Sequence, residues 1–233
     1  MSKVIHTPSI SFKGSHFEKS IILLTVRWYL TYNLSTRDME EIMGERGVSV
    51  DHSTIHRWVT KYAPQFSQQA RAKKGPVGVS WRLDETYIKV KGQWKYLYRA
   101  VDKEGNTVDF LLTAKRDTKA ALRFLRRAMG SSGLPEKINI DKSGANMAAI
   151  AAYNDDTGSS IEIRQCKYLN NIVEQDHRRV KRRVRVMLGF KSFRSATAIL
   201  AGIELVHMIR KRQVRPENTN DVMLASVFEA LAA

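Results

Sequence analysis

Three carboxylates in this chain have the surroundings and spacing needed for chemistry on a phosphodiester. Asp84 lies in the expected strand WRLDETYIKV, Asp141 follows the short apolar segment KINI, and Glu174 lies in a basic, helical segment. A carboxylate inside a strand is costly unless it is paired or binds a metal, and Mg²⁺ prefers oxygen ligands. The three acids therefore predict a site for two Mg²⁺ ions, with Mn²⁺ as a substitute. Such ions, roughly 3.5–4 Å apart, activate the attacking oxygen and stabilise the leaving oxygen of an in-line displacement.

Other polar residues near these acids have simpler interpretations. Glu85 directly follows Asp84, so the alternation of a strand predicts that Glu85 points to the opposite face of the sheet. Asp109 is expected on the surface of a strand. His177 could position a water molecule or a phosphate, although a local hydrogen bond is the simpler interpretation.

The segment that carries Glu174, NNIVEQDHRRVKRRVR at residues 170–185, sets one carboxylate, expected to be buried, among many positive charges. At helical spacing, Glu174, Arg178 and Lys181 share one face, and apolar residues supply contacts elsewhere on the helix. An acid is thus placed where phosphates are also attracted. Arg178, Lys181 and Arg182 are the predicted phosphate-binding residues of this helix.

The composition of the chain also indicates a partner that carries phosphates. The chain has 233 residues and a formal net charge of +16, which indicates a polyanionic partner, nucleic acid before an anionic membrane surface. Residues 164–194 hold ten Lys or Arg and two acids, half of the net charge. The single cysteine, Cys166, excludes an internal disulfide. No apolar run reaches transmembrane length and the first residues lack the core of a signal peptide, so we expect a cytosolic protein.

Two helices are predicted before residue 48. The first, residues 16–33, has four apolar residues at helical spacing: Phe17, Ile21, Leu24 and Trp28. Ser35 and Asp38 resemble a capping box that begins a second, short helix, and Gly47 is expected to end it.

A third helix is expected to begin after Asp51 as its N-cap and to end at Pro64. Its apolar stripe runs through Ile55 and Trp58, and its other face is polar and basic. The residues of that face that we expect to bind DNA are His52, Ser53, His56, Arg57 and Lys61. A helix, a turn with glycine and a second helix of this kind form the layout of a helix-turn-helix, whose second helix enters the major groove.

Beyond a linker at residues 65–76, the period changes from helical to strand-like. Three consecutive strands and then alternating helices and strands predict a mixed α/β sheet of five strands, an RNase H-like core. The expected strands are residues 77–90, 94–101, 107–113, 136–141 and 161–165. We therefore expect a helix-turn-helix domain at 1–64, a catalytic core at 77–213, and a tail at 214–233 that is a docked helix or frayed.

With these residues in hand, the sequence resembles bacterial DDE transposases of the insertion sequence six family. The segments that carry the resemblance are GVSVDHSTIHRWVTKYAP, WRLDETYIKVKGQWKYLYRAVDKEGNTVDF, INIDKSGA, YLNNIVEQDHRRVKRR and LGFKSFRSA. They span nearly the whole chain. By this resemblance Asp84, Asp141 and Glu174 would be the DDE triad, its last two members 33 positions apart, and Lys181 would contact terminal DNA.

The resemblance has further implications for the molecule. It implies a retroviral-integrase-like catalytic core that depends on Mg²⁺, and recognition of terminal inverted repeats by the N-terminal domain. It also implies a homodimer or a larger assembly on DNA, a replicative, cointegrate-forming reaction, and a cytoplasmic, nucleoid-associated protein.

Two other functions stay open on the sequence. An RNase H-like nuclease or resolvase would cleave without strand transfer and would yield hydrolysis products only. A non-catalytic helix-turn-helix repressor would keep its function when Asp84 or Glu174 is replaced.

Overall fold

The computed structural model describes residues 9–216 and 223–233, and the chain separates into two compact units. One unit, Pro76–Arg182, contains the sheet; the other combines Met1–Gly75 with Arg183–Ala233 and is helical. The predicted catalytic core, residues 77–213, therefore divides differently, because the residues after 182 pack with the N-terminal helices. No helix in the described residues is long and apolar enough to cross a membrane.

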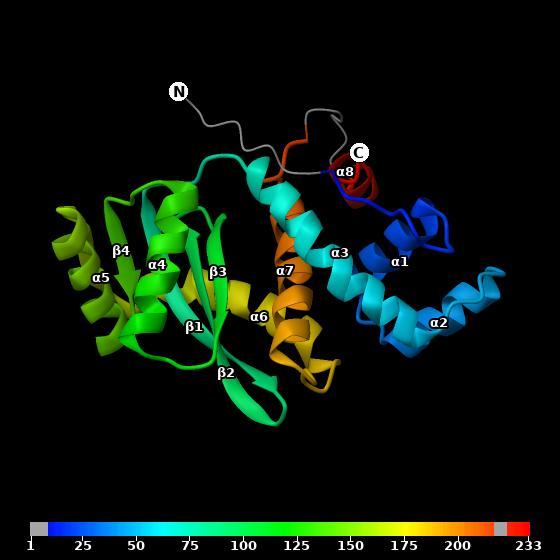
Figure 1. Ribbon diagram of the computed structural model, residues 1–233. Helices are drawn as coiled ribbons and strands as arrows, with labels where there is room; N and C mark the ends of the chain where they lie inside the picture. The colour runs from blue at the N-terminus through cyan, green and yellow to red at the C-terminus, as the bar shows by residue number, and fades with distance from the viewer. Residues whose placement is uncertain (1–8, 217–222) are drawn as a thin grey trace. The chain divides into compact units, whose positions relative to one another are not determined.

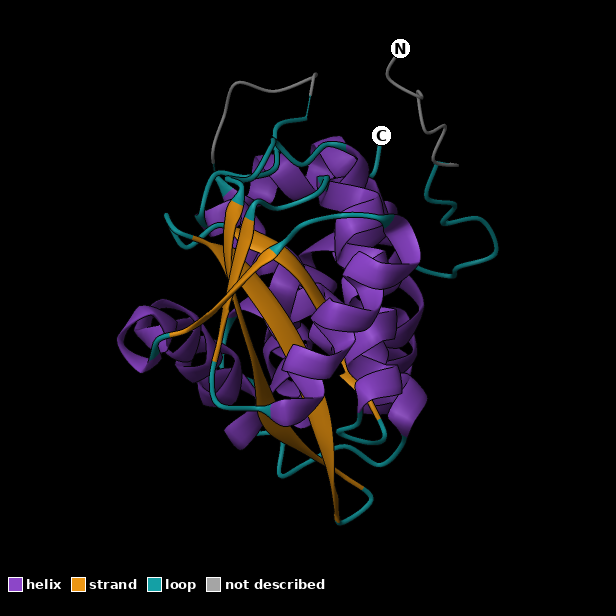
Figure 2. Cartoon of the chain, turned by 90° about the vertical axis from the view of Figure 1, so that its left-hand side faces the viewer, coloured by secondary structure: helices purple, strands orange, loops and turns teal. Residues whose placement is uncertain are grey.

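The sheet has five strands in the order β3-β2-β1-β4-β5 (Figures 1 and 2). β1 pairs with β2 and β2 with β3 in antiparallel fashion, whereas β4 is parallel to both β1 and β5. The strands are β1 (Ser80–Val90), β2 (Gln93–Asp102), β3 (Thr107–Thr113), β4 (Lys137–Ile140) and β5 (Glu162–Gln165). This mixed order of a meander followed by parallel strands confirms the RNase H-like sheet that the sequence predicts.

Helices α4 (Thr118–Ser132) and α5 (Gly144–Thr157) cover one face of this sheet (Figure 1). The core between them is apolar and includes Trp81, Tyr98 and Phe124. Asp109, expected on a strand surface, is buried instead and pairs with Arg127 at 2.8 Å. After β5, a 3₁₀ turn, η1 (Lys167–Asn170), leads into α6 (Asn171–Arg185), and the boundary between the two units falls inside α6.

The helical unit begins with α1 (Lys19–Thr31), α2 (Thr36–Glu45) and α3 (His52–Ala72). Both expected helix starts are confirmed: Ser35 and Asp38 form a complete capping box, and the Asp51 side chain accepts from the backbone N–H groups of Ser53 and Thr54. The apolar face expected for α1 was wrong. The face next to it is buried instead, and it consists of Ile22, Leu23, Val26, Tyr29 and Leu30.

Helix α3 does not end at Pro64, as the sequence suggested, but continues to Ala72. Most of the predicted linker at residues 65–76 is therefore helical. A proline inside a helix loses one backbone hydrogen bond at a cost of about 3 kcal/mol. Burial offsets that cost here, because Phe66 and Ala70 beyond the proline are fully buried and the Phe66 ring lies 5.2 Å from Phe228.

The C-terminal elements of this unit are α7 (Phe193–Arg210) and α8 (Leu224–Leu231). Glycine at position 202 lets α7 approach its neighbours closely: a Cβ there would lie 2.5 Å from a methyl group of Leu30 and 2.9 Å from the Ala63 Cβ. Val227 and Phe228 of α8 are buried, so the described part of the tail is a docked helix.

Candidate active site

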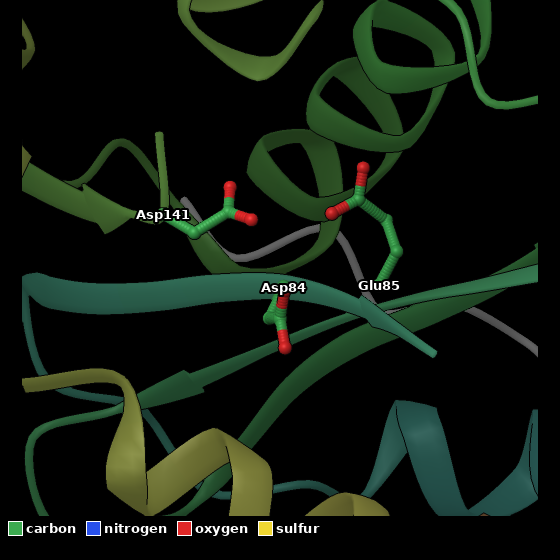
Figure 3. A group of neighbouring side chains, drawn as sticks. All are labelled: Asp84, Glu85 and Asp141. Atoms are coloured by element: carbon green, nitrogen blue, oxygen red, sulfur yellow. The ribbon is translucent and has the colours of Figure 1, made fainter. Parts of the chain in front are cut away.

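The alternation of β1 sends Asp84 and Glu85 to opposite faces of the sheet, as predicted (Figure 3). Glu85 shares its face with Leu83 and, in the paired strand, with Tyr98, which both belong to the core under α4 and α5. Asp84 is paired in register with Arg99 of β2, on the other face. Asp141 follows the last residue of β4, a strand that runs parallel to β1.

All three predicted acids line one pocket of about 370 Å³. The lining residues are Asp84, Ile140, Asp141, Lys142, Gln165, Lys167, Asn170 and Glu174. Glu174 was expected to be buried, but the structure leaves it exposed at the first turns of α6. The pocket thus collects carboxylates from a strand, a strand end and a helix, which is the arrangement that the sequence predicts.

Two contacts from α6 join it to the Asp84 face. The His177 Nε2 atom lies 3.1 Å from Asp84 Oδ2, so His177 makes a hydrogen bond to a site residue. Next to it, Asp176 accepts from Arg99 at 2.9 Å, and both side chains of this ion pair are buried. A buried Arg charge is tolerated only when it is paired, so α6 must keep this position along the sheet. Glu174, two residues before Asp176, is positioned by the same helix.

Asp141 is held by its own loop and by an arginine. The backbone N–H of Ser143 donates to Asp141 Oδ1 at 2.9 Å, and the Arg116 guanidinium lies 3.6 Å from Asp141 Oδ2. Almost half of the Asp141 side chain is exposed. Asp141 is therefore oriented but still open to a ligand.

The Glu85 carboxylate lies close to Asp84 and Asp141, although its side chain points to the opposite face of β1. One oxygen atom from each of Asp84, Glu85 and Asp141 lies within 4.8 Å of the others, the spacing of a metal site. However, Glu85 accepts from Arg116 Nε and from Asn146 Nδ2, both at 3.1 Å. Burial raises the pKa of the Glu85 carboxyl, and the Arg116 charge opposes this shift. Glu85 is therefore a carboxylate whose oxygens already have partners.

Sequence reasoning missed Arg116 and Asn146. Arg116 lies in the loop between β3 and α4, and Asn146 lies in the first turn of α5, where neither strand alternation nor helical spacing marks a residue as part of a site. The only available signal was the adjacent pair Asp84-Glu85, since a second acid next to a metal ligand needs a partner of its own.

The oxygen donors of this pocket fit a divalent metal ion of the Mg²⁺ or Mn²⁺ type. Asp84, Asp141 and Glu174 offer carboxylates, and Asn170 and Gln165 add amide groups to the lining. Such ions take oxygen ligands and retain bound water, which needs the open side that Asp141 and Glu174 provide. The acid cluster is thus chemically suited to metal binding.

The basic residues predicted on α6 differ in exposure. Arg178, Lys181 and Arg182 are exposed, as phosphate binding requires. Arg183 is buried, and its Nε atom donates to the Tyr29 carbonyl at 3.1 Å. Its Nη2 atom donates to the same carbonyl and, at 3.2 Å, to the Leu34 carbonyl. Arg183 therefore contributes to the helical unit and not to the exposed positive surface.

The predicted DNA-binding residues of α3 are all exposed: His52, Ser53, His56, Arg57 and Lys61. Local contacts hold several of them. The His52 Nδ1 atom lies 2.9 Å from Glu40 of α2, Arg57 donates to Thr54 at 2.6 Å, and the His56 Nε2 atom lies 3.3 Å from the Ser195 hydroxyl. The helix thus presents an ordered polar face at its start.

Comparison with known proteins identifies the family of this chain. A family model described as a DDE domain matches residues 78–213. The chain is 40% identical over 224 residues to the transposase for insertion sequence-like element IS431mec of Staphylococcus aureus, covering 92% of this chain and 99% of that protein. Over the same shares it is 39% identical to the Staphylococcus aureus transposase for insertion sequence element IS257 in transposon Tn4003.

Among solved structures, the HTLV-2 integrase catalytic core domain in complex with magnesium (trimeric form) is similar at a TM-score of 0.45 and 18% identity. The similarity covers 55% of this chain and 84% of that chain.

The mixed sheet carries Asp84 in β1, Asp141 after β4 and Glu174 in α6, and all three lie inside the range of the DDE-domain model. The chain belongs to the DDE transposases of the insertion sequence six family, because the family model spans more than half of it and the two transposases match almost end to end. The family predicted from the sequence is thereby confirmed.

Proposed function

We propose that this protein binds the terminal inverted repeats of its insertion sequence, cleaves one strand at each end and joins the freed 3′-OH to target DNA. The observation that carries this proposal is that Asp84, Asp141 and Glu174 line one pocket. Water first attacks the phosphodiester at the element end, and the 3′ oxygen leaves. The 3′-OH then attacks a target phosphodiester, whose own 3′ oxygen leaves, and no covalent bond to the protein forms.

In this proposal the three carboxylates hold two Mg²⁺ ions, for which Mn²⁺ can substitute. When bound, such ions activate the attacking oxygen and stabilise the leaving oxygen. His177 fixes the Asp84 carboxylate through its 3.1 Å hydrogen bond, and Ser143 does the same for Asp141. Glu85 is not a ligand, because Arg116 and Asn146 occupy its oxygens.

DNA is held at two places. Arg178, Lys181 and Arg182 contact backbone phosphates near the pocket, an interaction that weakens steeply as salt rises. The exposed start of α3, with His52, Ser53, His56, Arg57 and Lys61, reads the terminal repeat in the major groove. We further propose that the protein acts as a dimer or larger assembly, by the replicative, cointegrate-forming route, in the bacterial cytoplasm at the nucleoid.

A strand-transfer assay with labelled element-end DNA, a plasmid target and Mg²⁺ tests the proposal. We expect joined product from the wild type and none from Glu174→Gln. Asp155→Asn, which changes an exposed carboxylate of α5, is the control and should join at the wild-type rate.

Each other outcome selects a different function. Cleaved ends without joined product would indicate a nuclease or resolvase. Binding of the ends with no metal-dependent reaction, and with Glu174→Gln unchanged from the wild type, would indicate a repressor.

A further inference from the structure

The β1–β2 hairpin extends beyond the rest of the sheet (Figures 1 and 2). β4 pairs with β1 only at its first three residues, Ser80 to Arg82, and β3 pairs with β2 only from Tyr96 onward. The outer part of the hairpin is therefore two-stranded. Its tip is a tight Lys91-Gly92 turn with φ values of 49° and 76°, the left-handed geometry of a type I′ hairpin.

One face of this outer hairpin carries two exposed aromatic rings, and they adjoin the half-buried Tyr96, which packs against the core. Tyr87 and Trp94 are 48% and 60% exposed. The Tyr87 ring lies 6.2 Å from that of Trp94 and 5.4 Å from that of Tyr96, so the three rings form a continuous row. The opposite face holds Ile88 and Val90, which are almost fully buried. The hairpin thus already has its apolar anchor, and the exposed rings add a second apolar surface.

The same face is positively charged. The Lys89 ammonium group lies 5.9 Å from the Trp94 ring, and Lys91 is exposed at the turn. Between Glu85 and Asp102 the sequence contains no acid. Rings beside lysines, next to a Glu85 carboxylate whose charge Arg116 balances, suit a ligand that has flat aromatic groups and negative charges.

This surface begins next to the active site. Tyr87 lies three residues beyond Asp84 on β1, roughly 10 Å at about 3.3 Å per residue, and on the opposite face of the strand. It also shares its face with Glu85, whose partner Arg116 reaches Asp141. Beyond Arg82, β1 is an open edge of the sheet, because β4 pairs only with its first residues. A DNA strand that leaves the catalytic pocket around this edge would meet Tyr87 first and Trp94 next.

We propose that the row of Tyr87, Lys89, Trp94 and Tyr96, the hairpin platform, binds unpaired bases of the DNA strand beside the cleavage point by stacking. This inference rests on the proposed function, since it places the DNA strand at the pocket. Exposed rings stack on unpaired bases irrespective of sequence, whereas the bases of a duplex stack on one another and leave only phosphates for the lysines. The platform therefore recognises single-stranded flanking DNA.

The test compares two fluorescent element ends, one fully duplex and one with an unpaired flank of about six nucleotides, binding to the full-length protein. We expect Trp94→Ala to weaken binding of the unpaired flank by about 10-fold or more and to leave the duplex end unchanged, because one base–ring stack contributes about 1–3 kcal/mol. Trp94→Phe, which keeps a ring, should retain most of the affinity. Tyr32→Ala, which removes a ring that is 53% exposed in the helical unit, is the matched control.

A 2-aminopurine base in the flank adds a direct report on stacking. Its fluorescence should be quenched by the wild type and by Trp94→Phe, but not by Trp94→Ala. If Trp94→Ala weakened the binding of both DNA ends equally, or left the quenching unchanged, the proposal that the platform stacks on bases would be wrong. A change of oligomeric state in light scattering without selective loss of flank binding would also contradict it, and would make the rings a contact between protein copies. If the wild type binds neither DNA end, the proposed function itself fails.

Discussion

The two neighbouring acids of β1 have opposite environments on the two faces of one strand. Asp84 faces α6, contacts a histidine and lines the pocket with Asp141 and Glu174. Glu85 faces α4 and α5 and is enclosed by an arginine and an asparagine. Both carboxylates have an oxygen within 4.8 Å of one from Asp141, so distance alone does not separate them.

The difference shows that the exposure and the charge partner of a carboxylate, as well as its position, decide whether it can bind a metal. Glu85 is buried and its charge is balanced by Arg116, so a metal ion that bound Glu85 would have to displace the guanidinium from it. Asp84 accepts a contact from His177 and also lines the pocket. We therefore propose that the Asp84 face is the reactive one and that the Glu85 face supports it.

The largest expected effect comes from breaking the ion pair that holds α6 to the Asp84 face. Asp176→Asn removes a carboxylate that neutralises the buried Arg99 charge, so the free energy of unfolding should fall by about 3–5 kcal/mol. Urea unfolding followed by circular dichroism measures the change. The control is Asp156→Asn, which breaks the exposed pair with Arg126 and should cost less than about 1 kcal/mol. Equal losses in the two variants would contradict the anchoring of α6.

An intermediate effect, on Mn²⁺ affinity, distinguishes the polar partner of Asp84 from that of Glu85. His177→Ala removes the hydrogen bond that orients Asp84, and we expect Mn²⁺ affinity to fall about 10-fold or more, as for other groups that orient metal ligands. Asn146→Ala removes a partner of Glu85 and should change Mn²⁺ affinity by less than about 3-fold. Isothermal titration calorimetry gives both values. A larger loss of Mn²⁺ affinity in Asn146→Ala than in His177→Ala would indicate that Glu85 binds the metal.

The smallest expected effect concerns phosphate binding. Lys181→Ala, on the helix that faces Asp84, should reduce the slope of log affinity against log salt by about 1 for DNA ends, since one phosphate contact is lost. Lys119→Ala, on α4 at the other face of the sheet, should leave the slope unchanged. Fluorescence anisotropy at several salt concentrations measures the slopes, and equal slopes for Lys181→Ala and wild type would exclude this contact.

Much of the catalytic unit could be predicted because each signal was local. The Lys91-Gly92 turn, the strand at Thr107–Thr113 and the places of Asp84 in β1 and Asp141 after β4 follow from alternation and turn residues. The RNase H-like sheet was predicted correctly on those grounds, and the transposase family was predicted correctly from the resemblance of its motifs.

What the sequence did not reveal depended on packing between distant segments. Pro64 suggested the end of α3, but burial of Phe66 and Ala70 continues the helix. The return of α7 to the N-terminal helices and the contacts of Glu85 with Arg116 and Asn146 likewise join residues far apart in the chain. No periodicity within a segment encodes such contacts.

The measurement that tests the comparison most directly is the single-turnover rate of strand transfer in two variants, Asp84→Asn and Glu85→Gln, with Mg²⁺ and pre-cleaved element ends. Our account predicts that Asp84→Asn lowers the rate by about 1,000-fold or more, since metal-assisted charge stabilisation is worth several kcal/mol. Glu85→Gln should stay within about 10-fold of the wild type. A Glu85→Gln enzyme that is as inactive as Asp84→Asn would contradict the assignment of the reactive face.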